Sequence, residues 1–184
     1  MAIYAKNQSE YGCYMKKVVV FSQLDSDVLQ RLQAQYQVEV INPKLGDINE
    51  QIREQVKDAD GMIGAGRLLN KNNLFTAQQL KIISSVSVGY DNYDLAYLNQ
   101  KKIWLSNTPH VLTETTADLA FTLLMSAARK VPSLNQWTKR GQWKHTVAEA
   151  QFGRDIFGKT LGIVGLGNIG AAIARRGFYG FNMN

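Results

Sequence analysis

Three glycines near the carboxyl end of the sequence have the spacing of a phosphate-binding turn. Gly165, Gly167 and Gly170 form G-x-G-x-x-G directly after the apolar segment LGIVG and directly before AAIARRG, which has helical period. The first glycine permits a tight bend, the second lets the backbone approach a pyrophosphate, and the third lets the helix pack closely on the strand. The amides of Asn168 and Ile169 would then face the anion. The pattern predicts a dinucleotide site, with a βα turn that binds nothing as the alternative.

The ribose preference of that site cannot be read from these residues. An acidic residue that binds the ribose of NAD, or an arginine that accepts the extra phosphate of NADP, is expected about twenty positions after the first glycine. That position falls at or just beyond Asn184. Both NAD and NADP therefore stay open as cofactors.

A second candidate site lies in SVSVGYDNYDL, residues 85–95. A strand is predicted to end at Val88 and Gly89, and the chain then turns into a helix with Asp91 and Asp94 at capping-box spacing. Free amides at the carboxyl end of a parallel strand suit a small carboxylate. Alternatively, Gly89 only makes a turn and the aspartates only cap the helix. Physical reasoning alone leaves these two interpretations equal.

Short apolar segments alternate with segments of helical period from Met15 onward, which is typical of a parallel sheet covered by helices. Asp25 is predicted to cap the first helix, and Ile48, Ile52 and Val56 are predicted to share one face of the second. The predicted strands are KKVVVFS (16–22), VEVINP (38–43), GMIGAG (61–66), KIISSVSVG (81–89) and KIWLSNTP (102–109). The fold class predicted for residues 16–109 is therefore α/β, with a flavodoxin-like parallel sheet.

A different pattern begins after Pro109. TETTADLAFTLLMSAARKV (113–131) predicts a long helix opened by Thr115, with Asp118 at capping-box spacing, and its nearly all-round apolar character predicts burial between two bodies. Residues 135–159 are predicted to be polar connections, and TLGIVG (160–165) is predicted to be the first strand of a Rossmann domain. A parallel strand needs neighbours, so we expect residues beyond Lys159 to be poorly ordered or prone to aggregation in isolation.

Composition limits the possible partners. The 184 residues carry a net charge of +6, but the basic residues occur as scattered pairs without a continuous stripe, so no nucleic-acid or membrane partner is predicted. The single cysteine, Cys13, allows no internal disulfide, and no metal site is predicted. The amino terminus lacks the order of a secretory signal, which favours a cytoplasmic location. Residues 1–15 are predicted to be an extension or to precede a true start at Met15.

The segments SVGYDNYDL, SNTPHVLTETTADLAFTLLMSAAR, RGQW and KTLGIVGLGNIGAAIARR, in this order and at these separations, resemble the D-isomer-specific 2-hydroxyacid dehydrogenases. The resemblance is strongest to the glyoxylate/hydroxypyruvate reductase and 2-ketogluconate reductase branch, and it covers residues 15–184. It implies a substrate domain over 16–109 that lacks the C-terminal segment by which the chain returns to this domain. Residues 110–184 would be the crossing helix and a truncated NAD(P)-binding domain.

The resemblance also implies a reaction, the NAD(P)-dependent reduction of a small 2-oxo acid such as glyoxylate, hydroxypyruvate or 2-ketogluconate to the D-2-hydroxy acid. The amides of Val88 and Gly89 would hold the substrate carboxylate, and Thr116 would lie near the nicotinamide. The catalytic Arg, Glu and His of the family would lie beyond the chain end, so no catalytic residue is assigned and the chain alone is expected to be inactive. A complete enzyme would be a homodimer with residues 117–128 at its interface.

Three further residues could do chemistry but receive minor roles. His110 is interpreted as a hinge residue, and His145 as a loop residue with little prospect of a role. Arg67 follows the third predicted strand in a loop that, by the resemblance, faces the substrate, and a surface arginine is the preferred interpretation. Two alternatives to a dehydrogenase stay open: a noncatalytic, corepressor-like interaction protein on the same scaffold, and an inactive remnant that binds small carboxylates.

Overall fold

The computed structural model describes residues 15–184. The predictions for residues 1–14, including the interpretation of Cys13, lie outside the described residues. The chain divides into two compact units, of which the first ends at Pro109 and the second spans His110–Asn184. Each unit is described by itself.

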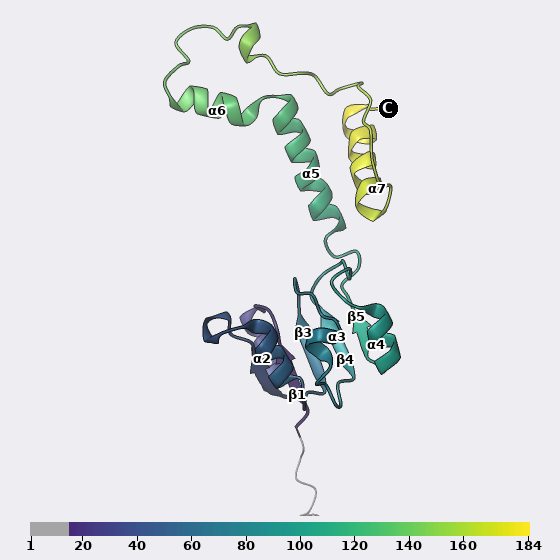
Figure 1. The fold of residues 1–184 in the computed structure, drawn as a ribbon. Helices are drawn as coiled ribbons and strands as arrows, with labels where there is room; N and C mark the ends of the chain where they lie inside the picture. Colours follow the sequence, from purple (N-terminus) through teal and green to yellow (C-terminus); the bar gives the residue numbers. More distant parts are fainter. Residues whose placement is uncertain (1–14) are drawn as a thin grey trace, which may run out of the picture. The chain divides into compact units, whose positions relative to one another are not determined.

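The first unit is built on a five-stranded parallel sheet (Figure 1). Its strands are β1 (Lys17–Val20), β2 (Gln37–Val40), β3 (Gly61–Gly64), β4 (Ile82–Ser85) and β5 (Trp104–Ser106). Their order in the sheet is β2-β1-β3-β4-β5, which is the flavodoxin-like order. The predicted α/β fold class is confirmed, and all five predicted strands form, each shorter than its apolar segment.

The helices of this unit begin where short polar side chains cap them. They are α1 (Ser26–Gln33), α2 (Ile48–Gln55), α3 (Lys71–Leu74) and α4 (Leu95–Lys101), with the 3-10 turn η1 (Pro43–Leu45). Asp25 caps α1 as predicted, because its carboxylate accepts a hydrogen bond of 2.9 Å from the amide of Asp27.

The predicted capping box at the start of α4 is wrong. Asp94 is itself the N-cap residue, and its carboxylate accepts a hydrogen bond from the amide of Tyr97. The helix starts later than predicted because the preceding segment is held elsewhere. The amide of Leu69 donates to the carbonyl of Asn92, and the amide of Asp94 donates to the carbonyl of Leu69.

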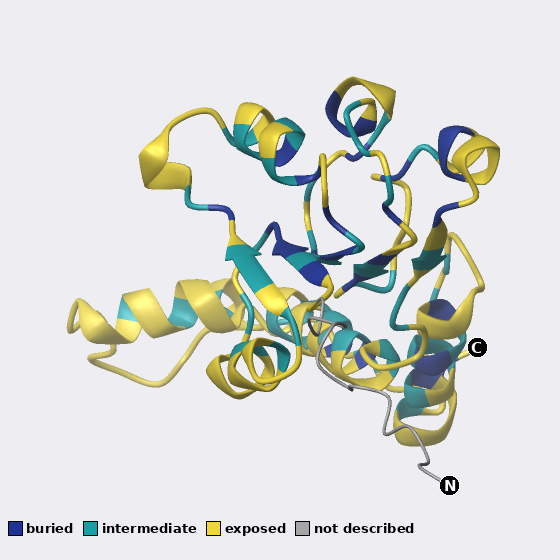
Figure 2. Cartoon of the chain, turned by 90° about the horizontal axis from the view of Figure 1, so that it is seen from below, coloured by how far each residue is buried: buried dark blue, intermediate teal, exposed yellow. Residues whose placement is uncertain are grey.

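The core lies between one face of the sheet and helices α2, α3 and α4. Val19, Met62 and Ile83 come from the strands, and Ile52 of α2 and Val56, the C-cap residue of that helix, pack against them as predicted. In Figure 2 the buried residues lie in the strands and on the helix sides that face them. Because the strands are packed into this core, their ends are held in place. The loops that leave those ends therefore start from fixed positions.

The second unit is helical. It contains α5 (Thr113–Ala128), α6 (Val131–Lys139), the 3-10 turn η2 (Glu149–Gln151), α7 (Asn168–Arg175) and the π-helical turn η3 (Arg176–Gly180). Helix α7 packs on α5, with the rings of Phe121 and Phe181 stacked at 5.0 Å. The Arg176 guanidinium donates to the carboxylate of Asp118 at 2.5 Å, and this hydrogen bond raises the pKa of Arg176 above its ordinary value.

Two sequence predictions for this unit need correction. Thr115 and Asp118 do not form a capping box, because α5 begins two residues before Thr115 and Asp118 pairs with Arg176 instead. Part of the predicted polar connection is the helix α6. Leu119 and Leu123 of α5 are 59% and 60% exposed, and the burial of α5 between two bodies stays a prediction.

The predicted strand TLGIVG does not form. Residues 160–165 have no strand assignment, and within the described residues no other strand of this unit exists to pair with them. Parallel strands are stable only inside a sheet with covered faces. The exposure of Val164 follows from this missing pairing, since nothing in the described second unit covers the side chain.

Candidate functional site

The loop after β4 presents unpaired backbone amides at the carboxyl edge of the sheet. Gly64 of β3 is the register partner of Ser85, and the amide of Val86 still donates to the carbonyl of Gly64. Beyond that point, the amides of Ser87, Val88 and Gly89 donate no hydrogen bond to any described residue. Exposed amides that follow one another at a strand end form a site for a small anion.

The carbonyls of Ser87, Val88 and Gly89 in the same loop are each engaged in a hydrogen bond. The carbonyl of Ser87 accepts from the amide of Thr108, and that of Val88 accepts from the side-chain amide of Asn107 at 2.8 Å. The carbonyl of Gly89 accepts from the Ser87 hydroxyl, whose oxygen also lies 2.7 Å from the hydroxyl of Ser85. Because the carbonyls are held, the peptide groups are fixed with their donors free, and this favours an acceptor ligand over a cation.

The glycine-rich turn of the second unit depends on glycine at two of its positions. Gly165 has a φ of +93°, which favours glycine. A Cβ atom on Gly170 would lie 2.1 Å from the carbonyl oxygen of Gly165, so any side chain there would force the turn open. Gly167 is the N-cap of α7 and has open space around it, which leaves room for a ligand to approach its backbone.

The amides at the start of α7 are available to such a ligand. The amides of Asn168, Ile169 and Gly170 donate to no described residue, as expected for the first turn of a helix without a side-chain cap. They add to the positive end of the helix dipole. The residues present therefore fit a pyrophosphate.

Thr116 lies in the second turn of α5 and is half-buried. Its amide donates to the carbonyl of Leu112, so only its side chain is left to contact a ligand. Val88 and Gly89 belong to the first unit, whereas Thr116 and the glycine-rich turn belong to the second. The roles given to these residues stay predictions.

The two histidines lie at exposed positions outside both candidate sites. His110 has a φ of +68° in the turn before α5, where its carbonyl accepts from the amide of Thr113. His145 lies in the loop after α6. Among residues 15–184, no group of three His, Cys, Asp or Glu side chains could hold a metal ion, and no helix is long and apolar enough to cross a membrane.

Sequence reasoning underestimated Arg67. The interpretation as a surface arginine is incomplete, since Arg67 is half-buried and lines a cavity of about 570 Å³ at the carboxyl ends of β1, β2 and β3. The signal available in the sequence was its position directly after a strand end. The element order that places three strand ends around it required the structure.

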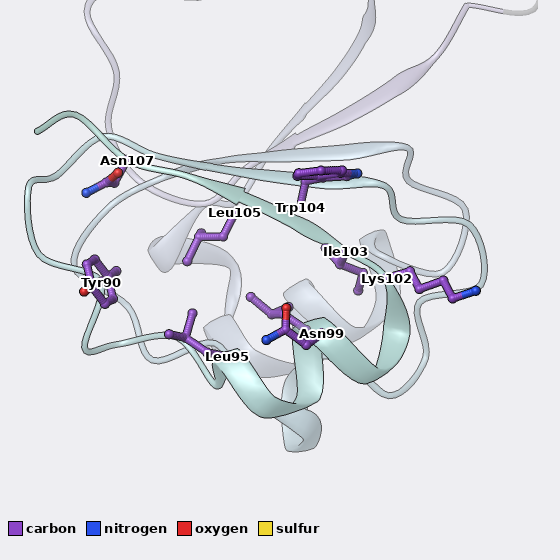
Figure 3. A pocket seen from close by; sticks show the side chains of 9 residues that line it. Tyr90, Leu95, Asn99, Lys102, Ile103, Trp104, Leu105 and Asn107 are labelled. Atoms are coloured by element: carbon purple, nitrogen blue, oxygen red, sulfur yellow. The ribbon is translucent and has the colours of Figure 1, made fainter.

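A larger cavity of about 710 Å³ lies between α4 and the edge strand β5 (Figure 3). Tyr90 and Asn107 line one end, and Lys102 and Trp104 line the other. Its lining is mainly apolar, and Lys102 is the only charged group in it, so the cavity has the character of an uncovered sheet edge. We assign no chemistry to it.

Comparisons with known proteins point to one enzyme family. The family profile of the D-isomer specific 2-hydroxyacid dehydrogenase catalytic domain matches residues 18–179. Glyoxylate/hydroxypyruvate reductase B of Citrobacter koseri is 39% identical over 166 residues, which are 90% of this chain and 51% of that protein. The corresponding protein of Yersinia pestis is 37% identical over the same length.

Solved structures show the same similarity. The TT0316 protein from Thermus thermophilus has a TM-score of 0.80 at 35% identity, over 91% of this chain and 54% of that one. The NADPH-dependent glyoxylate/hydroxypyruvate reductase of Sinorhizobium meliloti, solved in complex with citrate, has a TM-score of 0.74 at 30% identity, over 92% and 52%. The same reductase was also solved in complex with NADP and malonate. The chain spans about half the length of the relatives it matches.

Proposed function

This chain belongs to the family of D-isomer specific 2-hydroxyacid dehydrogenases, and we propose that it supplies binding groups for the NAD(P)-dependent reduction of a small 2-oxo acid to its D-2-hydroxy acid. Glyoxylate, hydroxypyruvate and 2-ketogluconate are the proposed substrate types. The observation that carries the proposal is the loop after β4, in which the amides are free and the carbonyls are held.

In this proposal the amides of Val88 and Gly89 bind the carboxylate of the 2-oxo acid. A carboxylate is an acceptor only, so it matches a row of donors without a proton transfer. The rigid sheet behind β4 fixes the position of the carboxylate and thereby of the adjacent oxo carbon. Orientation of the substrate is the contribution that these residues would make to the reaction.

The nucleotide half of the proposal uses the turn that contains Gly165, Gly167 and Gly170. The amides of Asn168 and Ile169 would bind the pyrophosphate of NAD or NADP, and Thr116 would contact the nicotinamide end. A bound nicotinamide supplies the hydride for the reaction. The preference between NAD and NADP is left open in the proposal.

No residue of this chain is proposed to transfer the proton. His110 and His145 lie outside both candidate sites, and the family resemblance places its Arg, Glu and His at positions that these 184 residues do not match. We propose that residues 1–184 bind substrate and nucleotide but do not catalyse the reduction by themselves. A homodimer that buries the exposed apolar residues of α5, such as Leu119 and Leu123, and a cytoplasmic location complete the proposal.

The test is a titration of the ¹⁵N-labelled chain, followed by NMR. Glyoxylate should shift the amide signals of Ser87, Val88 and Gly89, and NADH or NADPH should shift those of Asn168 and Ile169. Asn107→Ala removes the donor that holds the carbonyl of Val88, so it should weaken glyoxylate binding several-fold, about 1 kcal/mol. Asn99→Ala, at an exposed position of α4, is the matched control. Glyoxylate binding that leaves the three loop signals unmoved would contradict the carboxylate site.

A further inference from the structure

Two serine hydroxyls lie behind the loop that contains Val88 and Gly89. The hydroxyl oxygens of Ser85 and Ser87 are 2.7 Å apart, and the Ser87 hydroxyl donates a hydrogen bond of 2.7 Å to the carbonyl of Gly89. A serine hydroxyl has one proton to donate. Because Ser87 gives its proton to the Gly89 carbonyl, Ser85 is the donor in the contact between the two hydroxyls. The hydrogen bonds therefore run in one direction, from Ser85 through Ser87 to Gly89.

Ser85 anchors this chain of hydrogen bonds in the interior of the first unit. It is the last residue of β4, its register partner is Gly64 of β3, and it is only 3% exposed. Ser87 is half-buried. A hydroxyl that accepts a hydrogen bond becomes a better donor, and the gain is larger where little water is present. The carbonyl of Gly89 is thus tied to the sheet through two side chains.

The peptide group that Ser87 holds carries a further free amide. In a trans peptide the carbonyl of one residue and the amide of the next lie in one plane and point in opposite directions. A fixed carbonyl of Gly89 therefore fixes the amide of Tyr90, which donates to no residue in the range 15–184. Asn107 holds the preceding peptide group through the carbonyl of Val88. Two successive amides, those of Gly89 and Tyr90, are then oriented by separate donors.

Oriented amides matter here because the loop itself offers no positive charge to an anion. Residues 85–90 include no charged side chain. A Cβ atom on Gly89 would lie 3.5 Å from a carboxylate oxygen of Asp91, so a negative charge lies close to the loop. A carboxylate bound at this loop must gain its affinity from hydrogen bonds whose donors are already in place when it arrives.

We propose that Ser87, supported by Ser85, is a positioning residue for the carboxylate of the substrate. The inference rests on the proposed function and deepens it. Ser87 contacts neither the substrate nor the reacting atoms. It acts by holding the amide of Tyr90, which adds a hydrogen bond to those from Val88 and Gly89. The hydroxyls of Ser85 and Ser87 thereby contribute to the affinity for any small 2-oxo acid.

The experiment titrates glyoxylate into the ¹⁵N-labelled 184-residue chain and compares Ser87→Thr with Ser87→Val. The two new side chains have nearly the same shape, but only threonine keeps the hydroxyl. We expect Ser87→Thr to bind glyoxylate like the unmodified chain, and Ser87→Val to bind it about threefold to tenfold more weakly, the range for one hydrogen bond. Glyoxylate should shift the amide signals of Gly89 and Tyr90 in the unmodified chain. In Ser87→Val the shift at Tyr90 should be the more strongly reduced.

Ser84→Ala is the matched control for the loss of a hydroxyl contact on β4. The hydroxyl of Ser106 donates to that of Ser84 at 3.2 Å, on the face of the strand opposite to Ser85. Ser84→Ala should leave glyoxylate binding unchanged, whereas Ser85→Ala should weaken it about twofold, because Ser87 then loses its donor.

Two results would overturn the inference while glyoxylate still shifts the loop signals of the unmodified chain. One is equal affinity of Ser87→Thr and Ser87→Val for glyoxylate. The other is an equal loss of affinity in Ser84→Ala and Ser85→Ala, since the effect would then come from the strand as a whole. A failure of the proposed function is distinct, because glyoxylate would then move no loop signal even in the unmodified chain, and both proposals would fall.

Discussion

Two loops of this molecule offer free amides to an anion, but they differ in the secondary structure that supports them. The loop with Val88 and Gly89 leaves β4, which is paired with β3 on one side and β5 on the other. The glycine-rich turn, residues 165–170, follows a segment that pairs with no strand among the described residues. The same free amides are therefore supported by a five-stranded sheet in the first unit and by a segment that is not part of a strand in the second.

The difference separates what is encoded locally from what requires tertiary structure. The φ of Gly165 and the close approach of Gly170 to Gly165 are set within a few residues, so the turn forms with α7 alone. The position of the Val88 amide depends on Gly64, Asn107 and the sheet around them. The glycine-rich turn is thus present in a unit whose described residues form no sheet.

Hydrogen exchange should show the largest contrast between the two regions. Amides of the interior strand β4 should exchange only on unfolding of the first unit, with a free energy of roughly 5 kcal/mol or more. The amides of Ile163 and Val164 donate to no described residue and should exchange with little protection. Mass spectrometry on peptides from 80–86 and 160–166 measures both. Strong protection of the second peptide would show a pairing that the second unit does not contain.

Substitution of a buried residue should lower the free energy of unfolding in the first region much more than in the second. This contrast should be somewhat smaller than the one in hydrogen exchange. Ile83 of β4 is fully buried, so Ile83→Ala should lower the free energy of unfolding of the first unit by about 2–5 kcal/mol. Ile163→Ala is its matched control in the unpaired segment and should cost less than about 1 kcal/mol. Denaturant titration followed at NMR signals of each unit gives both values. Equal losses would mean that residues 160–164 are packed as firmly as the sheet.

Glycine substitutions test the turn itself. Gly170→Ala places a Cβ atom against the carbonyl oxygen of Gly165 and should weaken dinucleotide binding by about tenfold to a hundredfold, the range of a 1–3 kcal/mol overpacking cost. Gly162→Ala has open space and should leave binding unchanged. Fluorescence titration with NADH and NADPH measures the affinities. Unchanged binding by Gly170→Ala would remove the turn from the nucleotide site.

The sequence predicted those features whose causes are local or periodic. Alternating apolar segments predicted all five strands, and the spacing of Ile48, Ile52 and Val56 predicted the buried face of α2. The prediction of a strand at TLGIVG was wrong because strand formation depends on a partner strand, which an apolar pattern does not reveal. Thr115 and Asp118 were misread because a capping-box spacing also occurs inside a helix, where Asp118 pairs with Arg176 from another helix.

The candidate site divides in the same way. The glycines of residues 165–170 and the stretch around Val88 were found from the sequence, since their types and spacing carry the chemistry. The hydrogen bond from Asn107 and the exposed guanidinium donors of Arg67 were not found, because both depend on which strands become neighbours. Side chains that act through non-local neighbours need the topology before their role can be argued.

The smallest effect we predict concerns the ion pair at the amino end of the sheet, where the Lys17 ammonium donates to the carboxylate of Asp58 at 2.5 Å. The hydrogen bond from Lys17 lowers the pKa of Asp58 below its ordinary value of 3.8. A carboxyl group with a lowered folded-state pKa stabilises the fold above its unfolded-state pKa, and this stabilisation is lost as the pH falls through the folded value. Since the Asp58 side chain is 67% exposed, solvent screening keeps the effect below about 1 kcal/mol.

Asp58→Asn should therefore destabilise the first unit slightly at pH 7, and the difference from the unmodified chain should disappear on acidification below the folded pKa of Asp58. The matched control is Asp27→Asn in the first turn of α1, whose carboxylate has no ion-pair partner among residues 15–184. Urea unfolding of both variants at pH 7 and at a series of acidic pH values that begins at 3.8 and continues downward, followed at signals of β1, gives the comparison. A difference for Asp58→Asn that persists unchanged over the whole acidic series would mean that the substitution acts through packing around Lys17 and not through the charge of Asp58.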